Sequence, residues 1–262
     1  MTNKEIKILA VGNSFSDDAL AYLYHISRSG AVKLQTGNLM IGGCSLETHW
    51  ANAENDAAAY LYQVNASVQA ENVSIGEALR SESWTHVTLQ QASPYSGMDS
   101  TYFPYIVKLR EYIKRYAPQA EILIHQTWAY EIDFELEIFQ AYERDQTAMY
   151  HALSAAYQQA ADRLGARVIP VGDVIQRLRR TPPFDYERGG LSLCRDGFHL
   201  SIPYGRYAAA AVWHVFLTGE DITQNGYAPP CPENVTETEH REKVKSIQQA
   251  VREYFELEVN DV

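Results

Sequence analysis

The stretch EIKILAVGNSFS, residues 5–16, opens the sequence with a short apolar run that ends in Gly12. This pattern predicts a buried strand that leads directly into a turn. The next segment, DDALAYLYHISRSG at 17–30, has acidic residues at its start, apolar residues at helical spacing and a glycine at its end. It therefore predicts a helix. A strand followed at once by a helix is the repeating unit of a parallel α/β sheet.

The alternation of strand and helix continues along the chain. Further strands are predicted at 32–43, 85–91, 120–128 and 166–172, and further helices at 46–60, 74–84, 102–116, 137–164, 173–180, 203–218 and 236–256. Segment 60–72 alternates weakly and predicts either a hairpin or an irregular excursion. The five strands with helical crossovers indicate a doubly wound, mainly parallel sheet. Because no repeat, low-complexity tract or linker interrupts the pattern, we expect one domain over residues 1–262.

Composition narrows the classes of function. The chain has 262 residues, 46% of them hydrophobic, which is enough for one large buried core. Its formal net charge of −11 argues against nucleic acid or an anionic membrane as partner, since both require clustered Lys and Arg. No run approaches the roughly 20 apolar residues of a membrane span, and the start does not resemble a signal peptide. We therefore expect a cytoplasmic protein.

Motifs for metals and cofactors are missing from the sequence. The cysteines Cys44, Cys194 and Cys231 form neither a disulfide framework nor a metal-binding spacing, so we expect free thiols. There is no HExxH, CxxC pair, Walker loop or GxGxxG, and no phosphate loop follows the first strand. We expect neither a metal nor a cofactor, and an FMN-binding protein is disfavoured.

Polar residues follow several predicted strands. The first strand ends at GNSFS (12–16), and others end at IGGCS (41–45), LQQAS (89–93) and HQTW (125–128). In a doubly wound sheet, sites form at the carboxyl ends of the strands. An ordinary connection would need only a turn, so we expect a site at this edge.

Ser14 lies at the head of a predicted helix. Backbone N–H groups there are unpaired and can stabilise an oxyanion on a carbonyl that the serine attacks. The alternative is that Ser14 or Ser16 is simply the N-cap, which is the commoner role of an isolated serine after a strand. The late stretch RDGFHLS (195–201) places Asp196 three residues before His199. A histidine can take the serine proton and a carboxylate can hold the imidazole, unless Asp196 only caps a turn and His199 only packs.

Together, GNSFS, the glycine after the second strand, the polar block after the third and the late DGFHLS…YGRYAAAAVW resemble the SGNH hydrolases, the GDSL-type esterases and lipases. The late Asp-x-x-His before the last helix is the most specific part. The resemblance implies a flavodoxin-like doubly wound sheet of about five parallel strands in three α/β/α layers. It also implies Ser14 as nucleophile, His199 as base and Asp196 as the residue that orients the base. Asn13 departs from the family's usual Gly-Asp-Ser, at a position of structural support.

The resemblance further implies an oxyanion hole. The backbone N–H groups of Ser14 and Gly43 would contribute to it, with Gly42 as an alternative. The family's Gly-x-Asn is absent after the third strand, where Gln90 and Gln91 stand instead. A glutamine amide could donate the same hydrogen bond from a longer arm, and we favour Gln90 slightly.

Other side chains have two interpretations. Gln126 and Trp128 could lie beside the pocket, where the indole would stack on a sugar or cover an acyl group; Trp128 as core filler is equally consistent with its sequence. For His49 and Trp50 we favour packing over a place on the rim.

The remaining titratable candidates are expected to be structural. They are the interior histidines His86, His125 and His214, and the helix-start charges Asp17 and Asp18.

The sequence thus predicts a serine esterase that forms an acyl-enzyme. The lack of a long apolar lid disfavours long-chain lipids, and 18 tyrosines suit a sugar-facing rim, so an acetyl ester on a carbohydrate is the first hypothesis. The alternatives are a thioesterase or lysophospholipase-type enzyme, or a non-catalytic glycan-binding protein on the same fold. The partner would be a small-molecule or glycan ester. The acidic C-terminal helix could cover the sheet edge or pair with a second copy in a homo-oligomer.

Overall fold

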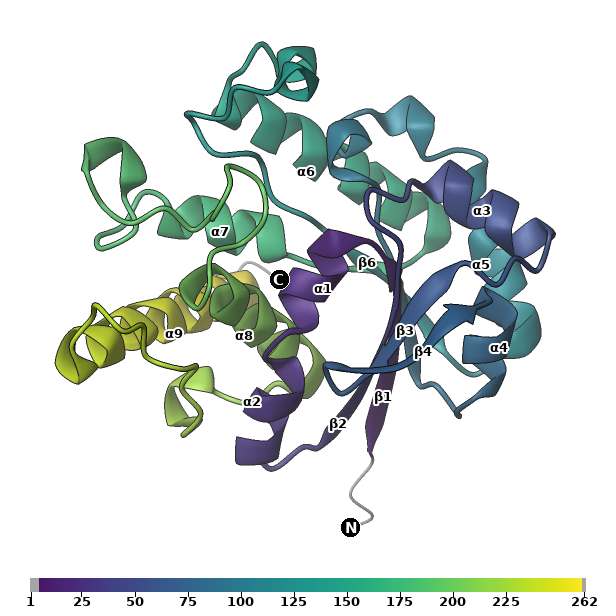
Figure 1. Ribbon diagram of the computed structural model, residues 1–262, viewed down its shortest axis with the longest axis horizontal. Coiled ribbons are helices and arrows are strands. Elements are labelled where there is room, and N and C mark those ends of the chain that lie inside the picture. The colour runs from purple at the N-terminus through teal and green to yellow at the C-terminus, as the bar shows by residue number, and fades with distance from the viewer. Residues whose placement is uncertain (1–4, 261–262) are drawn as a thin grey trace.

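The computed structural model describes residues 5–260, which form one mixed seven-stranded sheet flanked by helices (Figure 1). The strand order is β4-β3-β2-β1-β5-β6-β7. The strands are β1 Ile6–Gly12, β2 Leu34–Met40, β3 Tyr60–Val64, β4 Ser67–Val73, β5 His86–Leu89, β6 Glu121–His125 and β7 Arg167–Ile169. The run β2-β1-β5-β6-β7 is parallel throughout. The predicted doubly wound sheet of five parallel strands in three layers is therefore confirmed.

The helices divide between the two faces of the sheet. They are α1 Ser14–Leu20, α2 Leu23–Ser29, α3 Leu46–Glu54, α4 Ile75–Arg80, α5 Tyr105–Tyr116, α6 Gln146–Leu164, α7 Val171–Leu178, α8 Tyr204–Thr218 and α9 Glu237–Asn260. Short 3-10 turns are η1 Ser93–Tyr95, η2 Asp99–Thr101, η3 Glu137–Tyr142, η4 Tyr186–Arg188 and η5 Ile222–Gln224. Helices α1, α2 and α8 pack together on one face, with α7 and α9 against α8, while α3, α4 and α5 pack on the other (Figure 1).

Segment 60–72 forms a hairpin, one of its two predicted alternatives. Strand β3 pairs antiparallel with β2, and β4 pairs antiparallel with β3. The hairpin thus extends the five parallel strands by two at one edge of the sheet.

Strand β1 lies at the centre of the sheet, between β2 and β5. Its residues Ile8, Leu9, Ala10 and Val11 are at most 1% exposed, as expected for a strand covered on both faces. The chain leaves β1 towards α1 on one face and leaves β5 towards α5 on the other. Such a switch of direction opens a crevice at the carboxyl ends of the two strands. Ser14 lies two residues after the end of β1, at this crevice.

Two predicted helices are each divided in the structure. The helix predicted at 17–30 begins at Ser14 because the Asn13 side chain caps it, and it breaks between α1 and α2. The helix predicted at 137–164 is divided into η3 and α6. Asp145 causes this division by accepting the N–H groups of Thr147 and Ala148 in the first turn of α6.

Smaller differences concern the ends of elements. The strand predicted at 32–43 covers only Leu34–Met40, and the helix predicted at 46–60 stops at Glu54.

Candidate active site

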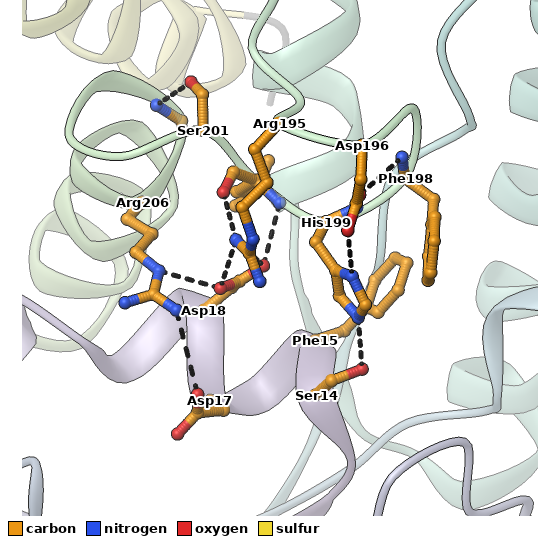
Figure 2. Close-up of polar contacts among 12 residues, drawn as sticks. Ser14, Phe15, Asp17, Asp18, Arg195, Asp196, Phe198, His199, Ser201 and Arg206 are labelled. Atoms are coloured by element: carbon orange, nitrogen blue, oxygen red, sulfur yellow. Dashed lines mark hydrogen bonds and ion pairs between the residues drawn. The ribbon is translucent and has the colours of Figure 1, made fainter. Parts of the chain in front are cut away.

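Three predicted catalytic side chains meet at the carboxyl edge of the sheet (Figure 2). Nε2 of His199 lies 2.9 Å from Oγ of Ser14, and Nδ1 of the same ring lies 2.7 Å from Oδ2 of Asp196. The side chains of His199 and Asp196 are 19% and 43% exposed, and Ser14 is half-buried. Residues 185 positions apart in the chain therefore form one continuous hydrogen-bonded row that solvent can reach.

The turn after β1 leaves the Ser14 hydroxyl available. The cap of α1 is Asn13, whose Oδ1 accepts the N–H of Phe15 at 3.0 Å. Ser14 is instead the first residue of the helix, so its own N–H has no intrahelical acceptor. Ser16 also does not cap the helix, because its hydroxyl donates to the Asn13 carbonyl or the Asn38 side chain. The capping alternative for Ser14 is therefore wrong.

The loop that carries Asp196 and His199 is closed like a short hairpin. Cys194 and Leu200 form an isolated antiparallel bridge, and the backbone N–H of residue 195 donates to the carbonyl of His199. Gly197 at the tip has a φ of +86°, and an added Cβ would lie 2.4 Å from the Phe134 ring, so only glycine fits there.

The environment of Asp196 favours its ionised form. Partial burial opposes ionisation, but the His199 ring and the backbone N–H groups of His199 and Phe198 donate to the carboxylate. These hydrogen bonds lower the pKa of Asp196 below its ordinary value of 3.8. An ionised Asp196 can hold the imidazole with Nδ1 protonated, which leaves Nε2 to accept the Ser14 proton.

The glycine loop after β2 is anchored next to this row through the residues that follow the two glycines. The Asn13 side chain donates to the Cys44 carbonyl at 3.1 Å, and the N–H of Leu46 donates to the Gln91 side chain at 3.0 Å. Directly before these anchors Gly42 and Gly43 are exposed, and Gly43 has a φ of +65°. The anchoring on Asn13 ties this loop to the turn that carries the nucleophile.

Gln90 and Gln91 do not serve as the predicted oxyanion donors. Gln90 is 2% exposed, donates to the Asn13 side chain at 2.9 Å and accepts from Nδ1 of His125 at 2.7 Å. The amide nitrogen of Gln91 donates to the carbonyl and hydroxyl oxygens of Thr101. The prediction is wrong because both amides are used inside the protein: Gln90 supports Asn13, and Gln91 holds the glycine loop.

Gln126 and Trp128 do not line a pocket either. Gln126 is 3% exposed, and its side chain binds Ser154 and Asp173. Trp128 is fully buried and stacks on Phe15, with ring centroids 4.3 Å apart. Their predicted contact with substrate is therefore wrong.

Trp128 has a supporting role that the sequence did not reveal. Its indole N–H donates to the carbonyl of Phe198 at 2.7 Å, and the Phe198 ring lies 3.9 Å from that of His199, centroid to centroid. Phe15, next to Ser14, completes this aromatic support. The sequence holds one signal for this aromatic support: Phe15 directly follows Ser14, and Phe198 directly precedes His199.

The histidines and Trp50 are placed as the packing interpretation predicted. His49, His125 and His214 are fully buried, and burial lowers the pKa of His49 and of His125 to about 3. His86 and Trp50 are partly buried. Within residues 5–260, no group of three or more His, Cys, Asp or Glu side chains is placed to hold a metal ion. None of the described helices is both long and apolar enough to cross a bilayer.

Comparison with protein families identifies relatives that cover most of the chain. A family described as a domain of unknown function, DUF4886, matches residues 7–246. The chain belongs to the DUF4886 family. A crystal structure of a DUF4886 protein from Bacteroides uniformis is 34% identical, with a TM-score of 0.86 over 96% of this chain and 95% of that one. The comparison with curated proteins gives no match.

More distant structures share the fold of this DUF4886 chain. A candidate SGNH hydrolase from Slackia heliotrinireducens is 20% identical, with a TM-score of 0.54 over 82% of this chain and all of that one. A candidate GDSL-like lipase from Parabacteroides merdae is 14% identical, with a TM-score of 0.53 over 82% of this chain and 96% of that one. The fold is therefore that of the SGNH hydrolases.

Proposed function

We propose that this chain is a serine ester hydrolase of the SGNH type. The observation that carries the proposal is the row Ser14–His199–Asp196, with its two contacts of 2.9 and 2.7 Å. In such a row the histidine accepts the serine proton as the hydroxyl attacks, and the carboxylate stabilises the imidazolium. The two short contacts match the geometry that this chemistry requires.

The proposed reaction has two halves. Ser14 Oγ attacks the ester carbonyl while His199 takes its proton, and the imidazolium then protonates the departing alcohol as the acyl-enzyme forms. Water next attacks the acyl-enzyme, with His199 accepting a proton from the water and returning it to Ser14 Oγ as the acid leaves. Asp196 holds the ring in the required tautomer throughout.

The oxyanion would be held by backbone donors. The N–H of Ser14 lies at the amino end of α1, where the helix dipole favours negative charge. The N–H of Gly43 is the second proposed donor, since its loop is exposed and is tied to Asn13 through Cys44. Removal of one such donor in other enzymes costs about 2.7–4 kcal/mol of barrier. A hole without a side-chain amide would therefore favour reactive esters.

We infer a short acyl group on a polar, carbohydrate-like alcohol as the substrate. A cavity of about 300 Å³ lies along α1, beginning one helical turn from Ser14. Its polar lining comprises Asp17, Tyr22, Thr36, Asn38, Gln63 and Arg206. A carboxylate, a guanidinium, hydroxyls and amides in one small cavity match the donors and acceptors of a sugar better than an alkyl chain.

Hydrolysis of p-nitrophenyl esters tests the proposal. We expect the protein to hydrolyse the acetate, with kcat/KM at least about tenfold above that for the octanoate. Ser14→Ala should lower the rate to that of buffer, while the neighbouring Ser16→Ala, as a matched control, retains the nucleophile. A panel of acetylated sugars, assayed for released acetate, then identifies the alcohol.

The possible failures of this experiment are distinct. Preference for octanoate or for a thioester would indicate the lysophospholipase or thioesterase alternative. Equal rates for wild type and Ser14→Ala, together with binding of an unmodified glycan, would indicate the non-catalytic binding protein.

A further inference from the structure

A buried carboxylate lies next to the candidate active site and takes no part in the proposed chemistry. Asp18 is fully buried, although it was expected to be only a helix-start charge. Its Oδ1 accepts from Nη1 of Arg195 at 2.9 Å and from Nε of Arg206 at 2.8 Å. Its Oδ2 accepts the backbone N–H of Leu200 at 2.8 Å and Nη1 of Arg195 at 3.1 Å. Figure 2 shows the carboxylate between the two guanidinium groups.

Asp18 and Ser14 contact the same loop at consecutive residues. They lie four positions apart on α1, so their side chains project from the same face of the helix. Ser14 contacts the side chain of His199, and Asp18 contacts the backbone of Leu200. Helix α1 and loop 194–201 are therefore in contact at two points, one helical turn apart. The contact between Asp18 and Leu200 fixes the position of the loop at which His199 meets Ser14.

The loop itself is closed around the residues that Asp18 binds. Arg195 donates through its side chain to both Asp18 and the carbonyl of Leu200, and through its backbone to the carbonyl of His199. Both backbone polar groups of Leu200 are thus held by Asp18 and Arg195. The tip of the loop, with Asp196 and His199, extends from this fixed base towards Ser14.

Charge around Asp18 comes from both elements that cover it. Arg195 belongs to the loop, Arg206 belongs to α8, and Nη2 of Arg206 also lies 3.9 Å from the Asp17 carboxylate. Burial of such ions has a large desolvation penalty, so a buried ion pair is weak evidence for stability. A carboxylate with four polar contacts is better explained by the geometry that it specifies.

We propose that Asp18 is a positioning residue that fixes loop 194–201 on α1 so that the His199 ring meets Ser14 Oγ. The inference rests on the proposed esterase function, because its effect is measured through Ser14. The side chain of Asp18 touches neither substrate nor the reacting atoms and acts only through Leu200 and Arg195.

The test compares Asp18→Asn and Arg195→Gln with wild type on p-nitrophenyl acetate and a fluorophosphonate probe. We expect each variant to lower kcat and the labelling rate about 100-fold, because a misplacement of about 1 Å has that effect, while KM changes less than threefold. The double variant should lose no more than either single one, since the two residues act through one contact. Arg167→Gln is the control: it removes a guanidinium and its ion pair with Glu121 at the amino end of β7, the edge of the sheet opposite the site, and should leave kcat within threefold of wild type.

The outcomes separate the two proposals. Wild type that neither hydrolyses nor is labelled contradicts the esterase function. Active wild type with Asp18→Asn and Arg195→Gln within threefold of its kcat overturns the positioning role. If Asp18→Asn does not fold, Arg195→Gln decides. Hydrogen exchange at the Leu200 amide gives a readout without activity: faster exchange in the folded Asp18 or Arg195 variant supports the role, and unchanged exchange overturns it.

Discussion

Two groups of polar residues lie at the carboxyl edge of the sheet, and they differ in where their polar atoms point. The pair from loop 194–201 keeps partly exposed side chains, with His199 in contact with Ser14 and Asp196 in contact with His199. The glutamines after β5 and β6, Gln90 and Gln126, are at most 3% exposed and bind only other protein groups. Polarity at a strand end therefore indicates the edge of the site, and the partners of each side chain decide whether it belongs to the chemistry.

The largest effect is expected at His199. His199→Gln removes the base, and the loss of such a residue lowers kcat by about 10⁶-fold in a comparable triad. Steady-state hydrolysis of p-nitrophenyl acetate measures the loss, and the exposed His25→Gln is the control. A His199→Gln variant that keeps its activity would show that His199 is not the base. Loop 194–201 would then have no greater part in the chemistry than the buried glutamines.

Replacement of Asp196 by Asn should have the next largest effect. The variant keeps the shape of the side chain but favours the wrong tautomer of His199, which lowers kcat by about 10⁴-fold in an equivalent triad. A kcat within tenfold of wild type would contradict the role of Asp196.

The features of this site that depend on residues close together in the sequence could be predicted. Those that depend on contacts between distant residues could be predicted only in part. The strand after which Ser14 stands and the Asp196–His199 spacing depend on nearby residues, and both could be predicted. The functions of Gln90 and Trp128 depend on Asn13, His125 and Phe198, which are distant in sequence. A strand-end rule cannot tell which of two polar neighbours finds a partner inside the fold.

The glutamine group should affect stability instead of chemistry. Gln126→Met removes three hydrogen bonds to the partly buried residues Ser154 and Asp173, and we expect the free energy of unfolding to fall by about 2 kcal/mol. Urea denaturation measures this, and the exposed Gln140→Met is the control. If Gln126→Met instead changed KM for p-nitrophenyl acetate and left the free energy of unfolding unchanged, Gln126 would be a substrate-binding residue after all.

The buried His125, which binds Gln90, should also make the free energy of unfolding depend on pH in acid. The pKa of His125 is lowered to about 3 by burial, from an ordinary value of 6.5, so below about pH 6.5 the unfolded chain binds a proton that the folded one does not. The free energy of unfolding therefore falls as pH falls towards 3. His125→Gln should make this slope shallower by about 1.4 kcal/mol per pH unit near pH 5, unlike His25→Gln. Parallel curves for wild type and His125→Gln would contradict this expectation.

The fold was more predictable than the limits of its elements. Apolar runs and glycines at their ends gave the five parallel strands, because burial on both faces leaves a clear pattern. The division at Asp145 was missed because a capping side chain competes with an otherwise continuous helical pattern.

The most direct test of the account is the site at which a fluorophosphonate reacts. After labelling, intact mass and peptide mapping should show one adduct per chain, on Ser14, and His199→Gln should abolish it. An unlabelled protein, or an adduct on a different serine with Ser14 unmodified, would contradict the proposal that the hydroxyl after β1 is the nucleophile.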